Sequence, residues 1–160
     1  KTLNENAFLS LSRGELERAR RAQAPLSLIA IEVENFSEVS EKHGKDIAND
    51  MLMLIAQAIR EKSRPYDGVG RYGENIFLIP LPGVIGQDAE KIATRIAKGI
   101  MNTDISLLDG TALDVKLGAG VVSSMRITAA TEIEMLIEKA GEALAGSRQD
   151  GDNQVHTIFL

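Results

Sequence analysis

Apolar residues along the 160-residue chain recur with two different periods. Apolar positions three and four residues apart are typical of helices, and they predict helices over residues 4–23, 36–42, 46–62, 87–101 and 131–146. Short apolar or alternating runs are typical of strands, and they predict strands over residues 26–33, 70–72, 76–81, 113–123 and 155–159. Helices and strands in this order predict a single mixed α/β domain, an α+β sandwich around one sheet.

The strand predicted over residues 26–33 is almost continuously apolar, which favours a central position with both faces buried. Glu32 and Glu34 lie at its carboxyl end, and residues two apart in a strand point to the same side. Later in the chain, Thr131 and Glu134 have the spacing of a helix capping box. We expect the methionines Met51, Met53 and Met135 to fill the core.

The amino-acid composition excludes several kinds of binding site. Hydrophobic residues make up 44% of the chain and charged residues 26%, as in ordinary globular domains. Eighteen basic and 23 acidic side chains give a net charge of −5, which argues against nonspecific nucleic-acid binding. The absence of cysteine excludes disulfides and thiolate metal sites, and the cytoplasm is the expected compartment.

No apolar run approaches the roughly 20 residues that a membrane span needs, so we expect no membrane contact by this domain itself. The chain begins with Lys1 and ends within a predicted strand at Leu160. We therefore expect residues 1–160 to be one domain of a longer, multidomain signalling protein, whose other parts could include a membrane anchor.

Four segments together resemble a GGDEF domain: N-E-N-A-F at residues 4–8, I-E-V-E-N-F at 31–36, R-Y-G-E-N-I-F at 71–77 and G-D-N-Q-V at 151–155. The resemblance covers nearly the whole chain. It implies a nucleotide-cyclase palm-like fold with a mostly antiparallel central sheet, flanking helices and a β-hairpin at residues 70–81. It also implies the family's reaction, in which two GTP condense to cyclic di-GMP with two divalent metals held by acidic side chains.

The chain departs from the family's pattern at the positions that would hold those metals. The family has an aspartate at the end of the first strand and acids in the hairpin, where this chain has Glu32, Asn75 and Ile76. A neutral amide is a poor Mg²⁺ ligand, and Glu74 adds negative charge where a triphosphate would lie. The sequence-based interpretation is a degenerate domain that is not an enzyme and needs no metal cofactor.

Other positions of the resemblance have changed as well. Ser40 and Asn49 replace an asparagine and an aspartate that read guanine in the family. Arg148 matches the family's triphosphate-binding lysine, but Asp152 replaces the arginine that follows it. An aspartate facing phosphates would repel them, which favours the same interpretation.

A second site of the family, which binds the product cyclic di-GMP, keeps its signature. Arg64 and Asp67 form the R-x-x-D motif before the hairpin, and Arg95 matches a further arginine on the following helix, one turn after Lys91. A guanidinium can bind a guanine edge or a phosphate with two hydrogen bonds, and a carboxylate can accept from guanine N–H groups. The resemblance therefore predicts a cyclic di-GMP receptor that signals through ligand-linked dimerisation or a contact with a neighbouring regulatory domain.

Simpler interpretations of the same residues stay open. Asp67 and Gly68 suit a turn, Arg64 suits a helix end, and Lys91 and Arg95 suit the solvent face of an amphipathic helix. The alternative functions are a protein-interaction or dimerisation module that binds no nucleotide and a domain that binds GTP as an allosteric input.

Overall fold

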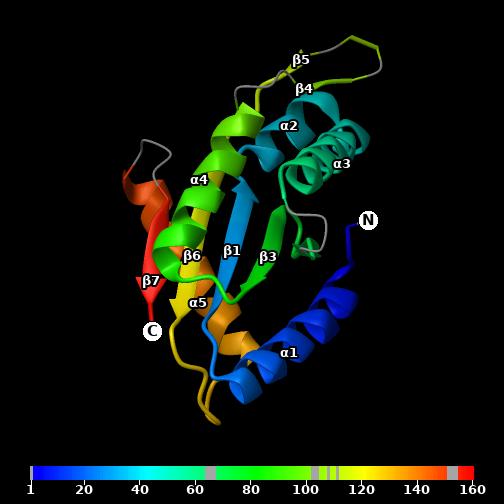
Figure 1. The fold of residues 1–160 in the computed structure, drawn as a ribbon. Coiled ribbons are helices and arrows are strands. Elements are labelled where there is room, and N and C mark those ends of the chain that lie inside the picture. The colour runs from blue at the N-terminus through cyan, green and yellow to red at the C-terminus, as the bar shows by residue number, and fades with distance from the viewer. Residues whose placement is uncertain (1, 64–67, 102–104, 108, 111, 151–154) are drawn as a thin grey trace.

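A five-stranded sheet organises the chain, and Figure 1 shows the computed structural model. Its strands are β1 (Leu26–Val33), β2 (Gly70–Tyr72), β3 (Ile76–Pro82), β6 (Leu117–Ser124) and β7 (His156–Phe159). They lie in the order β2-β3-β1-β6-β7, and every neighbouring pair is antiparallel except β6 and β7. Two short strands, β4 (Ile105–Ser106) and β5 (Ala112–Leu113), pair separately. The structure describes residues 2–63, 68–101, 105–107, 109–110, 112–150 and 155–160, apart from the side chains of 149 and 150.

Helices cover both faces of this sheet. The described helices are α1 (Glu5–Ala22), α2 (Phe36–His43), α3 (Lys45–Lys62), α4 (Gly86–Met101) and α5 (Ile133–Asp150). Figure 1 shows α4 in front of the sheet and α5 behind it, with α1 on the side of α5 and α2 packed on α3. Within the described part of the chain, none of the helices is both long and apolar enough to cross a membrane.

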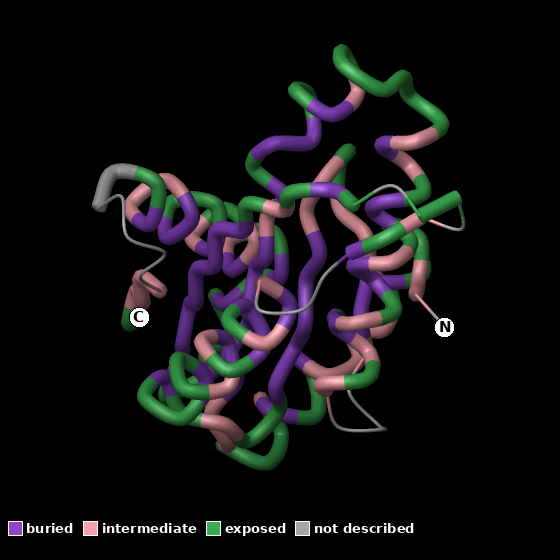
Figure 2. The backbone as a smooth tube through the Cα atoms, turned by 90° about the horizontal axis from the view of Figure 1, so that it is seen from above, coloured by how far each residue is buried: buried purple, intermediate pink, exposed green. Residues whose placement is uncertain are grey.

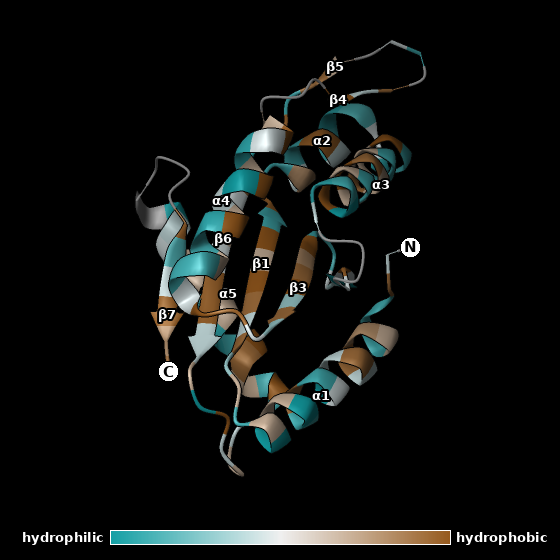
Figure 3. Cartoon of the chain, viewed as in Figure 1, coloured by the Kyte–Doolittle hydropathy of each residue, from teal (hydrophilic) through white to brown (hydrophobic). Residues whose placement is uncertain are grey.

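The alternation of side chains along β1 divides the core into two clusters. Ile29, Ile31 and Val33 pack with α2, α3 and α4, whereas Leu28 and Ala30 pack with α1 and α5. Both sets are buried because successive strand residues point to opposite faces of the sheet. The central strands β1, β3 and β6 are accordingly almost wholly buried, and they form the purple centre of the tube in Figure 2 and much of the brown in Figure 3.

The segment before α1 forms backbone hydrogen bonds with the hairpin of β2 and β3. The Leu3 N–H donates to the Val69 carbonyl at 2.8 Å, and the Arg71 N–H donates to the Leu3 carbonyl at 2.9 Å. The ring of Phe8 lies where a side chain on Gly70 would be, so only glycine allows α1 to approach β2 this closely. These contacts place the turn of the hairpin beside the first turn of α1.

The structure confirms the predicted fold, with a mixed sheet, flanking helices and the hairpin at residues 70–81. The prediction of one strand over residues 113–123 was wrong, because β5 and β6 are separate and pair with different partners. Met53 is 69% exposed, so its assignment to the core was also wrong. It lies two residues from the buried Met51, and that spacing on a helix turns it away from the sheet.

The predicted capping box also does not form. Helix α5 begins at Ile133, and the Thr131 hydroxyl accepts the Thr128 N–H at 3.1 Å. The Glu134 carboxylate instead binds the guanidinium of Arg13 on α1. A contact between two helices has therefore replaced the local bond that the spacing predicted.

Candidate functional site

Glu32, the first of the two predicted acids, lies at the carboxyl end of β1 on the side of α5. Its carboxylate forms an ion pair with the guanidinium of Arg148 near the end of α5. The Glu32 side chain is 14% exposed and that of Arg148 is 48% exposed. The resemblance compared Glu32 with a metal-binding acid and Arg148 with a triphosphate-binding lysine, and the structure pairs the two side chains with each other.

The second acid, Glu34, lies on the same side, as the strand pattern predicted. Its carboxylate covers Gly118 of β6, which is the register partner of Glu32. A side chain at position 118 would occupy the place of the Glu34 carboxylate, so this glycine makes room for it. Glu34 itself is exposed to solvent.

Asn75 links the hairpin to the end of β1. Its side-chain amide donates to the Val33 carbonyl at 2.8 Å, and the Val33 N–H donates to the Asn75 carbonyl at 2.9 Å. A carboxylate at this position could not donate the first of these bonds. The next residue, Ile76, is half-buried against the cluster of α1 and α5. Both residues therefore have structural contacts at positions where the family has acids.

The turn of the hairpin forms one hydrogen bond to α1 and one within the hairpin. The Gly73 N–H donates to the carboxylate of Glu5 on α1 at 3.1 Å, and the Arg71 guanidinium donates to the Glu74 carbonyl at 2.8 Å. Gly73 has a φ of +62°, in the left-handed region that glycine adopts without strain. The Glu74 side chain is exposed.

The described side chains do not fit a divalent-metal site. Among the residues that the structure describes, no three acids or histidines stand together as metal ligands. Glu32 already binds Arg148, and Asn75 directs its amide to Val33. We therefore assign no metal ligand here and derive no reaction step through a metal.

A pocket of about 320 Å³ lies between the N-terminal segment, α3 and the hairpin. Buried apolar residues, Leu52, Ala56 and Phe77, form part of its wall. Arg60 and Arg71 also line it, and the Arg60 guanidinium binds the hydroxyl of Thr2. An apolar wall beside two guanidinium groups is suited to a flat base that carries an anionic group.

Sequence reasoning missed this pocket. Arg71 was noticed only as part of a motif, and Arg60 looked like an ordinary cation in the last turn of a helix. Neither Ser40 nor Asn49, the positions compared with guanine-reading residues, lines the pocket. The one feature of the sequence that could have indicated the pocket is that Arg60 and Arg71 lie on either side of the connection between α3 and β2.

The two predicted ligand residues on α4 lie as the helical spacing predicted. Lys91 and Arg95 are both exposed and stand one turn apart, while Ala93, Ile96 and Ile100 of the same helix are buried. Neither Lys91 nor Arg95 forms an ion pair with another residue that the structure describes. The remaining predicted residues, Arg64 and Asp67, lie outside the described residues, as does Asp152.

The family described as "Diguanylate cyclase, GGDEF domain" matches residues 2–154. The chain belongs to the GGDEF family. It is 29% identical over 157 residues to diguanylate cyclase DosC of Escherichia coli, a match that covers 97% of this chain and 33% of DosC. The chain thus spans about a third of the length of this curated relative.

Solved GGDEF domains share the fold. The GGDEF domain of YfiN from Pseudomonas aeruginosa superposes with a TM-score of 0.88 at 24% identity, covering 100% of this chain and 98% of that one. The GGDEF domain of DgcB from Caulobacter crescentus, solved in complex with cyclic di-GMP, has a TM-score of 0.86 at 16% identity, covering 98% and 91%. The predicted GGDEF fold is therefore confirmed.

The comparisons contradict the prediction that this GGDEF domain is not an enzyme. The matching family is that of the diguanylate cyclases, and DosC is named as one. The prediction depended on the side chains at Glu32, Glu74, Asn75 and Ile76, whereas the match extends over nearly the whole chain. Substitutions at a few positions therefore do not justify excluding the chain from the enzymes of its family.

Proposed function

We propose that this GGDEF domain binds cyclic di-GMP on the surface around Lys91 and Arg95 of α4, together with Arg64 and Asp67. One observation carries the proposal: two exposed cations stand one turn apart, and neither is paired with another described residue. A cation that is already available loses no internal partner when an anionic ligand arrives.

The chemistry of the four residues suits a cyclic dinucleotide. The guanidinium of Arg95 can hold a phosphate or the O6/N7 edge of a guanine with two parallel hydrogen bonds. The ammonium of Lys91 can contact a phosphodiester, and the carboxylate of Asp67 can accept from a guanine N–H. The structure of DgcB with cyclic di-GMP makes this dinucleotide the first ligand to test.

The symmetry of cyclic di-GMP would allow the ligand to join two copies of this domain. Cyclic di-GMP carries two guanines and two phosphates related by symmetry, so one molecule can contact two copies of the site. The signal would then be a homodimer or an altered contact with a neighbouring regulatory domain. Light scattering with and without the ligand distinguishes a dimer from a monomer.

Calorimetric titration of the chain with cyclic di-GMP tests the proposal. Arg95→Ala removes a charge-assisted hydrogen bond, which costs about 1.5–3 kcal/mol, or about 10- to 150-fold in Kd. Arg21→Ala is the matched control, because Arg21 is an exposed arginine on α1. Absence of heat at high micromolar ligand, or equal Kd values for both variants, would contradict the proposal and favour a nucleotide-free interaction module.

A second candidate function is favoured by the pocket beside α3. Its apolar wall and its two arginines suit a purine nucleotide such as GTP. Titration with GTP, with and without Mg²⁺, should then show binding that Arg60→Ala weakens, with Arg21→Ala as control. Chromatography of the same samples for cyclic di-GMP reports whether bound GTP is converted. Binding that is unaffected by Arg60→Ala would place the nucleotide elsewhere.

A further inference from the structure

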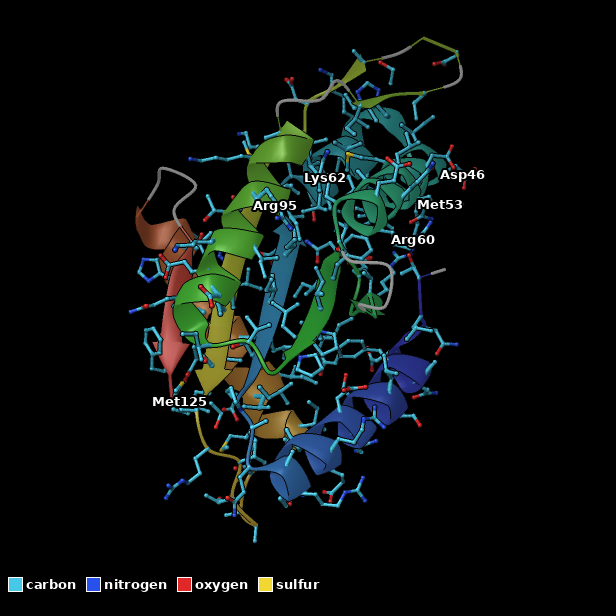
Figure 4. All side chains as sticks on the ribbon, in the orientation of Figure 1. Asp46, Met53, Arg60, Lys62, Arg95 and Met125 are labelled. Carbon is cyan, nitrogen blue, oxygen red and sulfur yellow. The ribbon has the colours of Figure 1, made fainter. Side chains whose placement is uncertain are left out.

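The side chain of Lys62, the last residue of α3, lies across Gly99 of α4. Its Cε, Cδ and Nζ atoms lie 2.8, 3.0 and 3.3 Å from the point that a Cβ on Gly99 would occupy. Any larger residue at position 99 would therefore push the lysine aside. Figure 4 shows Lys62 and Arg95 labelled beside each other where α3 meets α4.

Gly99 follows Arg95 by one helical turn, so the two positions share a face of α4. The half-buried stem of Lys62 lies over Gly99 and places its ammonium at this face, one helical turn from Arg95 and two turns from Lys91. A third cation from a second helix adds to the positive potential of this face and so to its attraction for an anion. Arg64, part of the predicted motif, follows Lys62 by two residues.

We propose that Lys62 is a further ligand-binding residue, whose ammonium contacts a phosphodiester of the nucleotide held at Lys91 and Arg95. Gly99 is the position that allows this, because it leaves space for the lysine stem. The inference rests on the proposed binding of cyclic di-GMP at this surface and adds a residue from a different helix to it.

The experiment measures the Kd of cyclic di-GMP by calorimetry at two salt concentrations. Lys62→Gln should weaken binding about twofold to fivefold and reduce the slope of log Kd against log salt concentration, because one ion contact is lost. Gly99→Ala should weaken binding without changing the net charge, since it displaces the lysine. The double variant should bind no worse than Lys62→Gln alone, because both changes remove the same contact.

Lys45→Gln is the matched control, since Lys45 is an exposed lysine at the opposite end of the same helix. It should leave both the Kd and the salt slope unchanged. Thermal unfolding of each variant separates loss of binding from loss of folding, and Lys62→Arg, which keeps the charge, should retain most of the affinity.

Different results overturn different statements. If the unchanged chain binds and Lys62→Gln binds equally well with the same salt slope, the role of Lys62 is refuted and the proposed function stands. If Gly99→Ala weakens binding but Lys62→Gln does not, Gly99 acts by another route and the inference is again refuted. If the unchanged chain binds no cyclic di-GMP, both proposals fail.

Discussion

The hairpin end of the sheet and the surface of α4 use their polar side chains in different ways. At the hairpin end these groups bind other parts of the domain: Glu32 binds Arg148, Asn75 binds the Val33 carbonyl, and Glu5 binds the Gly73 N–H. On α4, Lys91 and Arg95 point to solvent without an ion-pair partner among the described residues.

This difference indicates that the polar groups at the hairpin end stabilise the fold, whereas those on α4 are available to bind a ligand. A group with an internal partner stabilises the fold, and it must give up that partner before it can contact a ligand. An exposed cation contributes little to folding and is available to an anion. Substitutions at the hairpin end should therefore change the free energy of unfolding, whereas substitutions on α4 should change the affinity for nucleotide.

The largest expected change in the free energy of unfolding comes from substitution of one of two glycines in β6. A Cβ on Gly120 would lie 2.7 Å from the Leu144 N atom and 2.9 Å from the carbonyl carbon of Ala143, both in the backbone of α5. Gly120→Ala should therefore lower the free energy of unfolding by about 3 kcal/mol. At Gly118 the three nearest atoms all belong to the exposed side chain of Glu34, which can move, so Gly118→Ala should change it by less than about 0.5 kcal/mol. Urea denaturation measures both, and equal losses would refute the distinction.

Ligand-induced stabilisation compares the two regions directly. Cyclic di-GMP at 100 times its Kd should stabilise the folded chain by about 2.7 kcal/mol and raise Tm by roughly 5–10 °C. At that ligand concentration, Arg95→Ala should lose about half of the stabilisation or more, because its Kd is about 10- to 150-fold larger. Arg148→Ala should keep it, since that arginine binds Glu32. Thermal unfolding with and without the ligand measures this rise in Tm. An equal loss of the rise in Arg95→Ala and Arg148→Ala would contradict the distinction between the two regions.

A smaller effect is expected at Asn75. Asn75→Asp removes the amide donor to the Val33 carbonyl and should lower the free energy of unfolding by about 1–2 kcal/mol at neutral pH. A protonated aspartate can donate again, so the loss should shrink below about pH 4. The control is Glu74→Gln, at an exposed side chain, which should leave stability unchanged. A loss independent of pH would argue against the hydrogen bond as its cause.

The smallest expected effect comes from Glu134. The hydrogen bond from Arg13, followed by a backbone hydrogen bond, lowers the pKa of Glu134 from its usual 4.5, against a smaller opposing effect of burial. Because the folded pKa is lowered, the stabilisation is present above the unfolded pKa and is lost as pH falls through the folded value. Glu134→Gln should therefore flatten the decline of unfolding free energy below about pH 4.5. An unchanged slope would show that the contact contributes nothing in solution.

Much of the fold could be predicted from local patterns, and so could part of the site. Helical spacing predicted that Lys91 and Arg95 share a face of α4, and strand alternation predicted that Glu32 and Glu34 share a side. The same patterns failed at Thr131 and Glu134, because Arg13 on another helix competes for the carboxylate. They also failed for Met53, since a core assignment needs the orientation of the helix as well as its residues.

The sequence by itself determined the five helices, the buried strand β1 and membership of the GGDEF family, because each of these depends on local periodicity or on short motifs. Only the tertiary structure decided that Glu32 binds Arg148, 116 residues away, and that Lys62 lies over Gly99. The physical reason is that such contacts depend on how closely two separate helices or strands approach. The distance of approach depends on the packing of the whole core and cannot be obtained from the residues of either segment alone.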